Sequence, residues 1–272
     1  MSSERIRTGN IISQSASSVS TPKFKFHTRS VKSLALSAVN RCLLRLGYRI
    51  VPNRIKIGGY IEMEATVEGA KARDQTVCEY VETLWNQRGC TARVIEEMRR
   101  VGCFTSLKHV VEIGPGTGRY LDFLIGEVGP IRYEIYETAD DWAGWLARTY
   151  SPTVIRQPAD GHTLHQTPSQ SCGLVHAHGV FVYLSILNSF EYFSEVCRVL
   201  SPGGYFVFDF FPAASFDEAT IARWLAAEDR YPVVLPEEQV RKYFVANGFE
   251  LIHQFNNLYG KGQSHYFVFR RG

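Results

Sequence analysis

Cysteine is scarce in this sequence of 272 residues, and its six cysteines show no spacing that would bind a metal or form a disulfide framework. No two of them stand in a C-x-x-C pair. The sequence also lacks an H-x-x-x-H pair and any carboxylate cluster at metal-ligand spacing. We therefore expect buried free thiols, a reducing compartment such as the cytoplasm, and no metal site.

Long uninterrupted apolar runs are absent as well. Residues 161–190 contain no Asp, Glu, Lys or Arg, but histidines, polar residues and turn residues interrupt them. This stretch predicts protein core and not a membrane span. The N-terminus carries no apolar segment of the secretory type. With 45% hydrophobic residues, a chain of this length can fill one large core and a smaller appendage.

Acidic residues are nearly missing from the N-terminal part of the chain. The first 60 residues contain eleven Lys or Arg and one acid, Glu4, so their net charge is +10, whereas the remainder carries −7. Residues 1–30 are basic and rich in serine, which predicts a disordered tail. Residues 31–46 have an apolar face at helical spacing. This helix could pack as a lid, contact an anionic membrane surface peripherally, or belong to a mitochondrial-type presequence.

The most informative segment that is present spans residues 107–118, with the sequence LKHVVEIGPGTG. Its β-branched residues predict a short core strand, and the three glycines that follow allow a ligand to approach the backbone. A dinucleotide-binding fingerprint would require a further glycine where Arg119 stands. The pattern E-x-G-x-G-x-G, with Glu112 before Gly114, instead resembles motif I of the class I S-adenosylmethionine-dependent methyltransferases.

Later segments resemble the same family in the same order, over about residues 89–272. A strand over 131–137 ends in the acid Glu137, and a strand over 153–156 leads to Asp160 and Gly161. Strands follow over 173–178 and up to Asp209, and residues 249–255 and 265–270 predict a hairpin. The resemblance implies an α/β fold with a Rossmann-like seven-stranded sheet and a C-terminal antiparallel hairpin. It divides the chain into the tail 1–30, an N-terminal helical cap 31–104 and a methyltransferase domain 105–272.

The resemblance also implies S-adenosylmethionine as the cofactor. A carboxylate at the tip of the second strand, Glu137, can accept hydrogen bonds from both ribose hydroxyls. The family positions of the adenine contacts correspond to Asp160 and Gly161. The full predicted set of cofactor-binding residues is Glu112, Gly114, Pro115, Gly116, Gly118, Glu137, Asp160, Gly161 and His178.

Methyl transfer to a hydroxyl needs a group that accepts the proton, and His176 and His178 lie where ligands bind an α/β sheet. They stand at alternate positions, so both should point to one face of the strand. We predict His178 as the general base, with His176 and Asp209 as the alternatives. For each histidine, a polar contact to cofactor or backbone is the competing interpretation.

The acceptor is predicted from aromatic residues and from a tract over residues 44–52 that resembles leaders of bacterial glycan-modifying methyltransferases. Aromatic residues suit the face of a sugar ring, which favours O-methylation of a sugar or glycolipid hydroxyl. The seven aromatic residues on which this rests are Trp142, Trp145, Phe181, Tyr183, Phe210, Phe211 and Trp224. A small-molecule natural product is the second candidate, and a cofactor-binding module without turnover is the third. Nucleic acid is excluded, because the [DNS]-P-P-[YFW] signature of base methylation is replaced by His176-Ala177-His178-Gly179.

Overall fold

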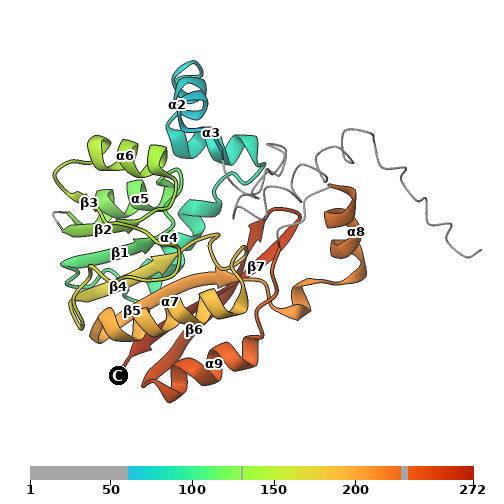
Figure 1. Ribbon diagram of the computed structural model, residues 1–272. Helices are drawn as coiled ribbons and strands as arrows, with labels where there is room; N and C mark the ends of the chain where they lie inside the picture. Colours follow the sequence, from blue (N-terminus) through green and yellow to red (C-terminus); the bar gives the residue numbers. More distant parts are fainter. Residues whose placement is uncertain (1–60, 130, 228–231) are drawn as a thin grey trace, which may run out of the picture. The chain divides into compact units, whose positions relative to one another are not determined.

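A computed structural model describes residues 61–129, 131–227 and 232–272. Its centre is one seven-stranded sheet with the order β3-β2-β1-β4-β5-β7-β6 (Figure 1). The strands are β1 (His109–Ile113), β2 (Arg132–Tyr136), β3 (Val154–Arg156), β4 (Cys172–Ala177), β5 (Leu200–Phe210), β6 (Phe249–Tyr259) and β7 (Gly262–Arg271). The first five pair in parallel, and β7 runs antiparallel to both β5 and β6. The predicted sheet and its C-terminal hairpin are confirmed.

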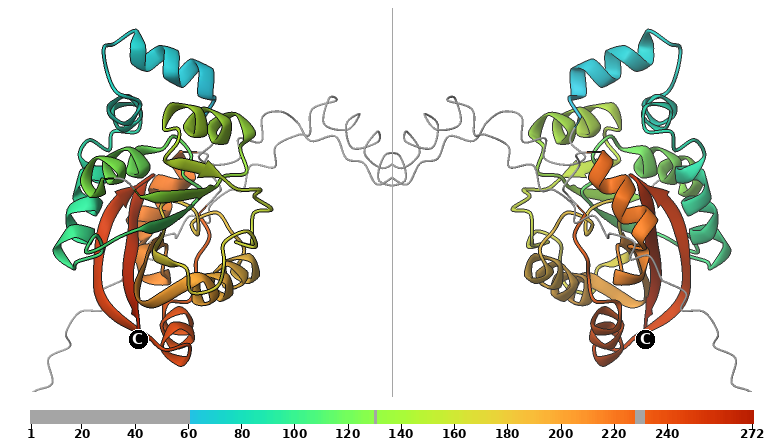
Figure 2. Two further views of the ribbon diagram at one scale, coloured as in Figure 1. Left: turned by 90° about the vertical axis from the view of Figure 1, so that its left-hand side faces the viewer. Right: turned by 90° about the vertical axis from the view of Figure 1, so that its right-hand side faces the viewer.

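Two layers of helices cover the two faces of this sheet (Figures 1 and 2). One face packs against α4 (Cys90–Arg100), α5 (Arg119–Val128) and α6 (Asp140–Thr149). The other packs against α7 (Ile186–Val199) and α9 (Glu237–Ala246). Strand β5 serves both faces by alternation, since Val207 joins the first cluster and Phe208 the second. Helices of the described part of the chain therefore cover both faces of the sheet.

The segment before β1 is helical, as predicted. Helices α2 (Met63–Lys71) and α3 (Val77–Leu84) pack on each other, and a capping box between Thr76 and Glu79 starts α3. Helix α4 is different, because Val94 and Met98 are buried in the same core as α5. The expected tail 1–30, the expected amphipathic helix 31–46 and the rest of the cap up to residue 60 lie outside the described residues.

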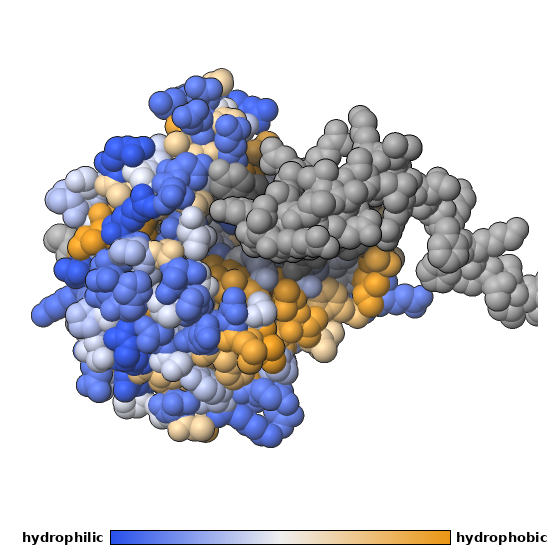
Figure 3. Space-filling model, viewed as in Figure 1, coloured by the Kyte–Doolittle hydropathy of each residue, from blue (hydrophilic) through white to orange (hydrophobic). Residues whose placement is uncertain are grey.

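The second variable segment follows β5. It contains the 3₁₀ turn η1 (Ala213–Ser215) and α8 (Glu218–Ala226), which packs Trp224 against Phe211. Helix α9 (Glu237–Ala246) follows, so the whole segment between β5 and β6 is mainly helical in its described part. Large exposed apolar side chains gather on this side, at the start of α7, on α8 and before α9, where Figure 3 shows orange surface. They are Ile186, Leu187, Ile221, Leu225 and Val234.

The described part of the fold contains no membrane-spanning helix, no cluster of metal ligands and no disulfide bond. None of the described helices is long and apolar enough to cross a membrane. Among the same residues, no group of three or more His, Cys, Asp or Glu is arranged to hold a metal ion. The cysteines of this part of the chain carry free thiols, four of them buried.

Candidate functional site

The glycine-rich loop after β1 meets the loops after β2, β3 and β4 at the carboxyl edge of the sheet. A Cβ added to Gly114 would lie 2.7 Å from Val180 Cγ2, so the loop after β4 covers this position. Gly116 differs, because it has a φ of +53° and no atom lies within 4 Å of an added Cβ. The space beside Gly116 is open, and any side chain there would both strain the backbone and fill that space.

Glu137 follows β2 and ties this loop to the sheet edge. Its Oε2 accepts a hydrogen bond from the Gly116 N–H at 2.8 Å, and its Oε1 accepts one from the Ala139 N–H at 2.8 Å. Burial raises the pKa of this carboxyl, and the backbone hydrogen bonds oppose the rise. The structure thus brings Glu137 to the open side of the loop, where a diol could replace the backbone donors.

The predicted adenine contacts lie nearby but differ in character. Gly161 has a φ of +87°, and a Cβ on it would lie 3.7 Å from Thr138 Cγ2, next to the end of β2. Asp160 is exposed, and its carboxylate accepts hydrogen bonds from the backbone of His162 and Thr163 at 2.9 and 2.7 Å. Asp160 therefore shapes its own turn, and its side chain has no oxygen turned exclusively to the cofactor side.

Helix α5 begins directly after the glycine loop. Gly118 is its N-cap with a φ of +77°, and no side chain caps the first turn. Pro115 is buried and its carbonyl accepts a hydrogen bond from the Gly118 N–H at 2.9 Å. The free N–H groups and the positive end of a helix dipole in such a turn suit a negatively charged ligand group.

Glu112, which was predicted to contact the cofactor, is buried among other side chains. Only 1% of it is exposed, and its Oε2 accepts a hydrogen bond from the Tyr133 hydroxyl at 2.8 Å. Burial raises the pKa of the carboxyl to about 8, against the effect of that hydrogen bond. Strand alternation explains the placement, because the side chain before Ile113 must point into the α4–α5 layer.

The two histidines lie together on that same face, as alternation predicts. His176 is fully buried, with Nε2 2.8 Å from the Tyr133 hydroxyl and Nδ1 3.0 Å from His178 Nε2. The His178 ring stacks on Tyr120 at 3.6 Å between centroids, and its Nδ1 lies 3.3 Å from the Tyr266 hydroxyl. Burial lowers the pKa of His176 to about 3 and holds the pKa of His178 well below its usual value. Both nitrogens of each ring have a hydrogen-bond partner, which argues against either histidine as a general base that acts alone.

Asp209 ends β5 beneath the turn after β4. It is fully buried, and its Oδ1 accepts a hydrogen bond from the Gly179 N–H at 2.6 Å. Burial raises its pKa to about 6. The carboxylate holds the backbone of the turn that follows β4, and it is not exposed to an acceptor.

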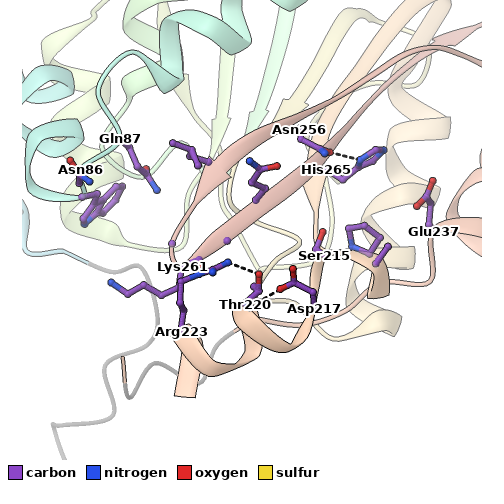
Figure 4. Close-up of a pocket in the computed structure, with 17 residues that line it drawn as sticks. Asn86, Gln87, Ser215, Asp217, Thr220, Arg223, Glu237, Asn256, Lys261 and His265 are labelled. Carbon is purple, nitrogen blue, oxygen red and sulfur yellow. Dashed lines mark hydrogen bonds between the residues drawn. The ribbon is translucent and has the colours of Figure 1, made fainter. Parts of the chain in front are cut away.

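A cavity of about 820 Å³ lies beside these loops, at the tip of the β6–β7 hairpin (Figure 4). Most of its lining side chains can form hydrogen bonds: Asn86, Gln87, Ser215, Asp217, Thr220, Arg223, Glu237, Asn256, Lys261, Gln263 and His265. None of the predicted site residues lines it. The cavity was not predicted, because its residues come from four segments without a recognisable motif.

Two contacts join this cavity to the glycine loop and the turn after β4. The guanidinium of Arg119, the first residue of α5, lies 4.9 Å from the ring of Trp85, which lines the cavity. On the hairpin, Tyr259 stands between the lining residues Leu258 and Gly260, and its hydroxyl lies 2.5 Å from a Cβ added to Gly179. The cavity therefore adjoins the carboxyl edge of β4.

His265 lines the cavity with a ring whose tautomer is defined by a hydrogen bond. Its Nδ1 lies 2.7 Å from Asn256 Oδ1, which can only accept, so Nδ1 carries the hydrogen (Figure 4). Its Nε2 is buried and has no hydrogen-bond partner. Burial lowers the pKa of His265, which favours the neutral ring.

The aromatic residues that suggested a sugar acceptor have a different role. Five of the seven are buried in the core: Trp142, Phe181, Phe210, Phe211 and Trp224. The expectation that they stack on an acceptor is therefore wrong for these five. Tyr183 is only partly buried, and its hydroxyl lies 2.8 Å from that of Tyr259.

The comparison with protein families decides the class of the protein. A family model described as a methyltransferase domain matches residues 77–254. The chain belongs to this methyltransferase family. It is an S-adenosylmethionine-dependent methyltransferase, and S-adenosylmethionine is its cofactor. No curated protein matches the sequence.

Solved methyltransferases share the fold of this methyltransferase at low identity. Magnesium protoporphyrin IX methyltransferase from Synechocystis, with SAH bound, is 12% identical with a TM-score of 0.56, over 89% of this chain and all of the other. A putative sarcosine dimethylglycine methyltransferase from Galdieria sulphuraria is 12% identical with a TM-score of 0.54, over 86% and 98%. A geranyl diphosphate methyltransferase in complex with GPP and sinefungin is 12% identical with a TM-score of 0.53, over 67% and 78%. The acceptors of these proteins differ, so the fold does not identify the acceptor of this one.

Proposed function

We propose that this methyltransferase methylates a hydroxyl group of a sugar or glycolipid. The observation that carries the proposal is the cavity of about 820 Å³ beside the carboxyl edge of β4, with its polar lining. Its amides, carboxylates and hydroxyls can pair with the vicinal hydroxyls of a sugar, and Trp85 offers a ring face. The proposed sugar acceptor thus rests on this lining and no longer on the aromatic residues, five of which are buried.

The lipid part of such an acceptor has a matching surface. Helix α8 contributes Thr220 and Arg223 to the cavity, while Ile221 and Leu225 on the same helix are 44% and 59% exposed. Helix α8 thus carries polar side chains that line the cavity and apolar side chains that are exposed beside it. An amphipathic acceptor could place its headgroup in the cavity and its chain on this apolar side (Figure 3).

The loops at the sheet edge fit the cofactor. The open space at Gly116 admits a ligand against the backbone, and Glu137 beside it supplies two carboxylate oxygens for the ribose hydroxyls. Gly114, Pro115 and Gly118 shape this loop, and Gly161 adjoins it. Bound S-adenosylmethionine supplies a methyl group that its sulfonium already activates.

A panel assay for release of S-adenosylhomocysteine tests the acceptor class. The panel contains free sugars, nucleotide sugars, lipid-linked glycans, phenols and fatty alcohols. We expect turnover with glycan acceptors, and faster turnover when the glycan carries a lipid. Turnover with phenols or fatty alcohols alone would refute the proposal and favour a small-molecule natural product.

A pair of histidine variants on the same hairpin tests the role of the cavity. His265→Gln changes a cavity residue, whereas His253→Gln changes a residue on β6 that contacts Glu97 and Arg100 outside the cavity. We expect the first variant to raise the acceptor KM about tenfold or more, which is the loss of roughly one buried hydrogen bond, with unchanged cofactor Kd. Equal kinetics of the two variants would show that the acceptor binds elsewhere.

A further inference from the structure

A continuous chain of hydrogen bonds runs beneath the cofactor loop from Tyr120 to Glu112. The Tyr120 and Tyr266 hydroxyls lie 3.3 Å apart, and Tyr266 lies 3.3 Å from His178 Nδ1. The chain then continues from His178 to His176 at 3.0 Å, as described above. It ends with two contacts of 2.8 Å, from His176 to Tyr133 and from Tyr133 to Glu112. Its members come from α5, β7, β4, β2 and β1 and the loop after β4.

All hydrogens in this chain can point one way when Glu112 is ionised. A carboxylate only accepts, so the Tyr133 hydroxyl donates to Glu112, and the Tyr133 oxygen accepts from His176 Nε2–H. A neutral imidazole with Nε2–H has a bare Nδ1, which accepts from His178 Nε2–H. His178 Nδ1 is then bare as well and accepts from the Tyr266 hydroxyl. Both rings are neutral and share the same tautomer.

Only one member of the chain reaches the protein surface. Glu112, Tyr133, His176 and Tyr266 are at most 1% exposed, and Tyr120 is buried too. His178 is partly exposed, at the carboxyl edge of β4 where the cofactor loop and the turn at Gly179 meet. A proton from outside can therefore enter the chain only at His178.

We propose that this chain takes up the proton of the acceptor hydroxyl at His178 and delivers it to Glu112. The inference rests on the proposed O-methylation for its proton source. The acceptor oxygen forms the new bond to the methyl carbon as the bond between that carbon and sulfur breaks, and its hydrogen leaves as a proton. His178 Nδ1 gains this proton as the Tyr266 hydroxyl turns its own hydrogen from Nδ1 to the Tyr120 oxygen 3.3 Å away, and Nε2–H passes its proton to His176 Nδ1. His176 passes its Nε2 proton to Tyr133, whose hydroxyl proton protonates Glu112.

The transfer leaves every histidine neutral. After it, both rings carry the hydrogen on Nδ1, and Glu112 donates to Tyr133, so the chain points the opposite way. This removes the difficulty that burial creates for His178 as a lone base, because a buried imidazolium is strongly disfavoured. The raised pKa of Glu112, about 8, makes it a stronger proton acceptor than an ordinary carboxylate.

The charged groups around the chain are few. Glu137 and Tyr150 interact electrostatically with Glu112, and the Tyr133 hydroxyl and His176 Nδ1 lie 2.8 and 3.8 Å from its carboxylate oxygens. Arg119 acts on His178, and it also acts on Tyr120 and Tyr266 together with Asp209. No lysine or arginine pairs with Glu112 among the described contacts, so this carboxylate becomes neutral by binding a proton.

Nitrogen NMR of the histidine rings in the cofactor-free protein tests the chain directly. The two ring nitrogens of a neutral histidine have distinct shifts, so the tautomer of each ring can be measured from pH 6 to pH 9. We expect His176 and His178 to change together from Nδ1–H to Nε2–H with a midpoint near the Glu112 pKa of about 8. Tautomers that stay fixed over this range, or rings that become imidazolium, would overturn the proposal.

Paired variants locate the link between the histidines and Glu112. Glu112→Gln should abolish the tautomer change, because no carboxyl titrates. Tyr133→Phe should also abolish it, since the rings lose their connection to Glu112. The matched control is Tyr136→Phe on the same strand, because the Tyr136 hydroxyl contacts Thr167 at 2.9 Å on the opposite face. Loss of the tautomer change in the control as well would assign the effect to general damage and refute the chain.

Kinetics separate this inference from the proposed function. In the wild type, kcat should rise with pH up to about 8, and Tyr133→Phe should lower kcat about tenfold or more and remove this rise, with unchanged cofactor Kd. A protein that shows the NMR change but methylates no hydroxyl would refute the O-methylation and the proton source while leaving the chain established. Turnover of hydroxyl acceptors with unchanged kcat in Tyr133→Phe would refute the relay and leave the proposed function standing.

Discussion

The free energy of unfolding of the cofactor-free protein should fall between pH 7 and pH 8 because of Glu112. Its carboxyl has an ordinary pKa of 4.5, and burial raises this to about 8 in the folded protein. Between these values the folded state binds one proton more than the unfolded state, so stability decreases as the pH rises. The lowered pKa values of His176 and His178 change the free energy of unfolding mainly below pH 6.5. Asp209, with a pKa of about 6, also changes it mainly below that pH. Glu137 and the buried cysteines also have raised pKa values, so the comparison with Glu112→Gln is needed to assign the loss between pH 7 and pH 8 to Glu112.

The magnitude follows from the folded pKa. Full linkage of one proton changes the free energy by about 1.4 kcal/mol per pH unit. Because the titration is half complete at pH 8, the loss from pH 7 to pH 8 is about 1 kcal/mol. With a urea dependence of about 2.5 kcal/mol per M, the unfolding midpoint should fall by roughly 0.4 M.

Urea unfolding of wild type and Glu112→Gln at the two pH values measures this. Glutamine keeps the volume and can accept the hydrogen bond from Tyr133, but it does not titrate in this range. The wild-type midpoint should fall and that of the variant should stay constant. Glu134→Gln serves as the control, because the hydrogen bonds from His109, Thr167 and Arg132 outweigh burial and lower the pKa of Glu134 to about 2. That variant should keep the wild-type pH dependence. A constant wild-type midpoint, or a falling one in Glu112→Gln, would refute the reasoning.

Three further outcomes are expected at the cofactor and acceptor sites. Gly116→Val should weaken cofactor binding in calorimetry at least tenfold, whereas Gly129→Val, also at positive φ and also in open space, should leave the Kd unchanged; equal affinities would remove Gly116 from the site. Glu137→Ala should cost about 1.5 to 3 kcal/mol of cofactor binding, and an unchanged Kd would contradict its contact with the ribose. His178→Ala should lower kcat about 100-fold with little change in cofactor affinity, and retention of kcat would exclude it from proton transfer.

The cofactor loop could be predicted because its information is local. Residues 107–118 contain the strand, the glycines and the start of the helix in one stretch, and strand alternation correctly predicted that His176 and His178 share a face. The acceptor cavity could not be predicted in this way. It combines Trp85 before α4, η1 and α8 after β5, and the tip of the hairpin, which only the three-dimensional fold brings together.

The contacts of Glu112 could not be predicted from the sequence either. Its place in motif I predicted a ligand contact, yet the parallel pairing of β1 with β4 sets Glu112 directly beside His176, and Tyr133 enters from β2. The register of strands whose contacting residues are 21 and 64 positions apart decides whether an acid faces solvent, a ligand or another side chain. The sequence contains all members of the chain but not the pairing that joins them.

A comparison of the two buried acids on adjacent strands shows why Glu112 points to chemistry and not only to structure. Glu134 is fully buried on the opposite face of the sheet, where Arg132 neutralises it, Thr167 donates a hydrogen bond to it and His109 Nε2 lies 3.2 Å from it, and its pKa is lowered to about 2. The fold can therefore bury a carboxylate permanently when it supplies a cation. Glu112 is buried to the same degree, and its contacts are with Tyr133 and the neutral His176. A carboxyl in this environment gains and loses its proton near pH 8. Buried acids poised in this way are typical of active sites, and the chain to His178 gives this one its route to the acceptor.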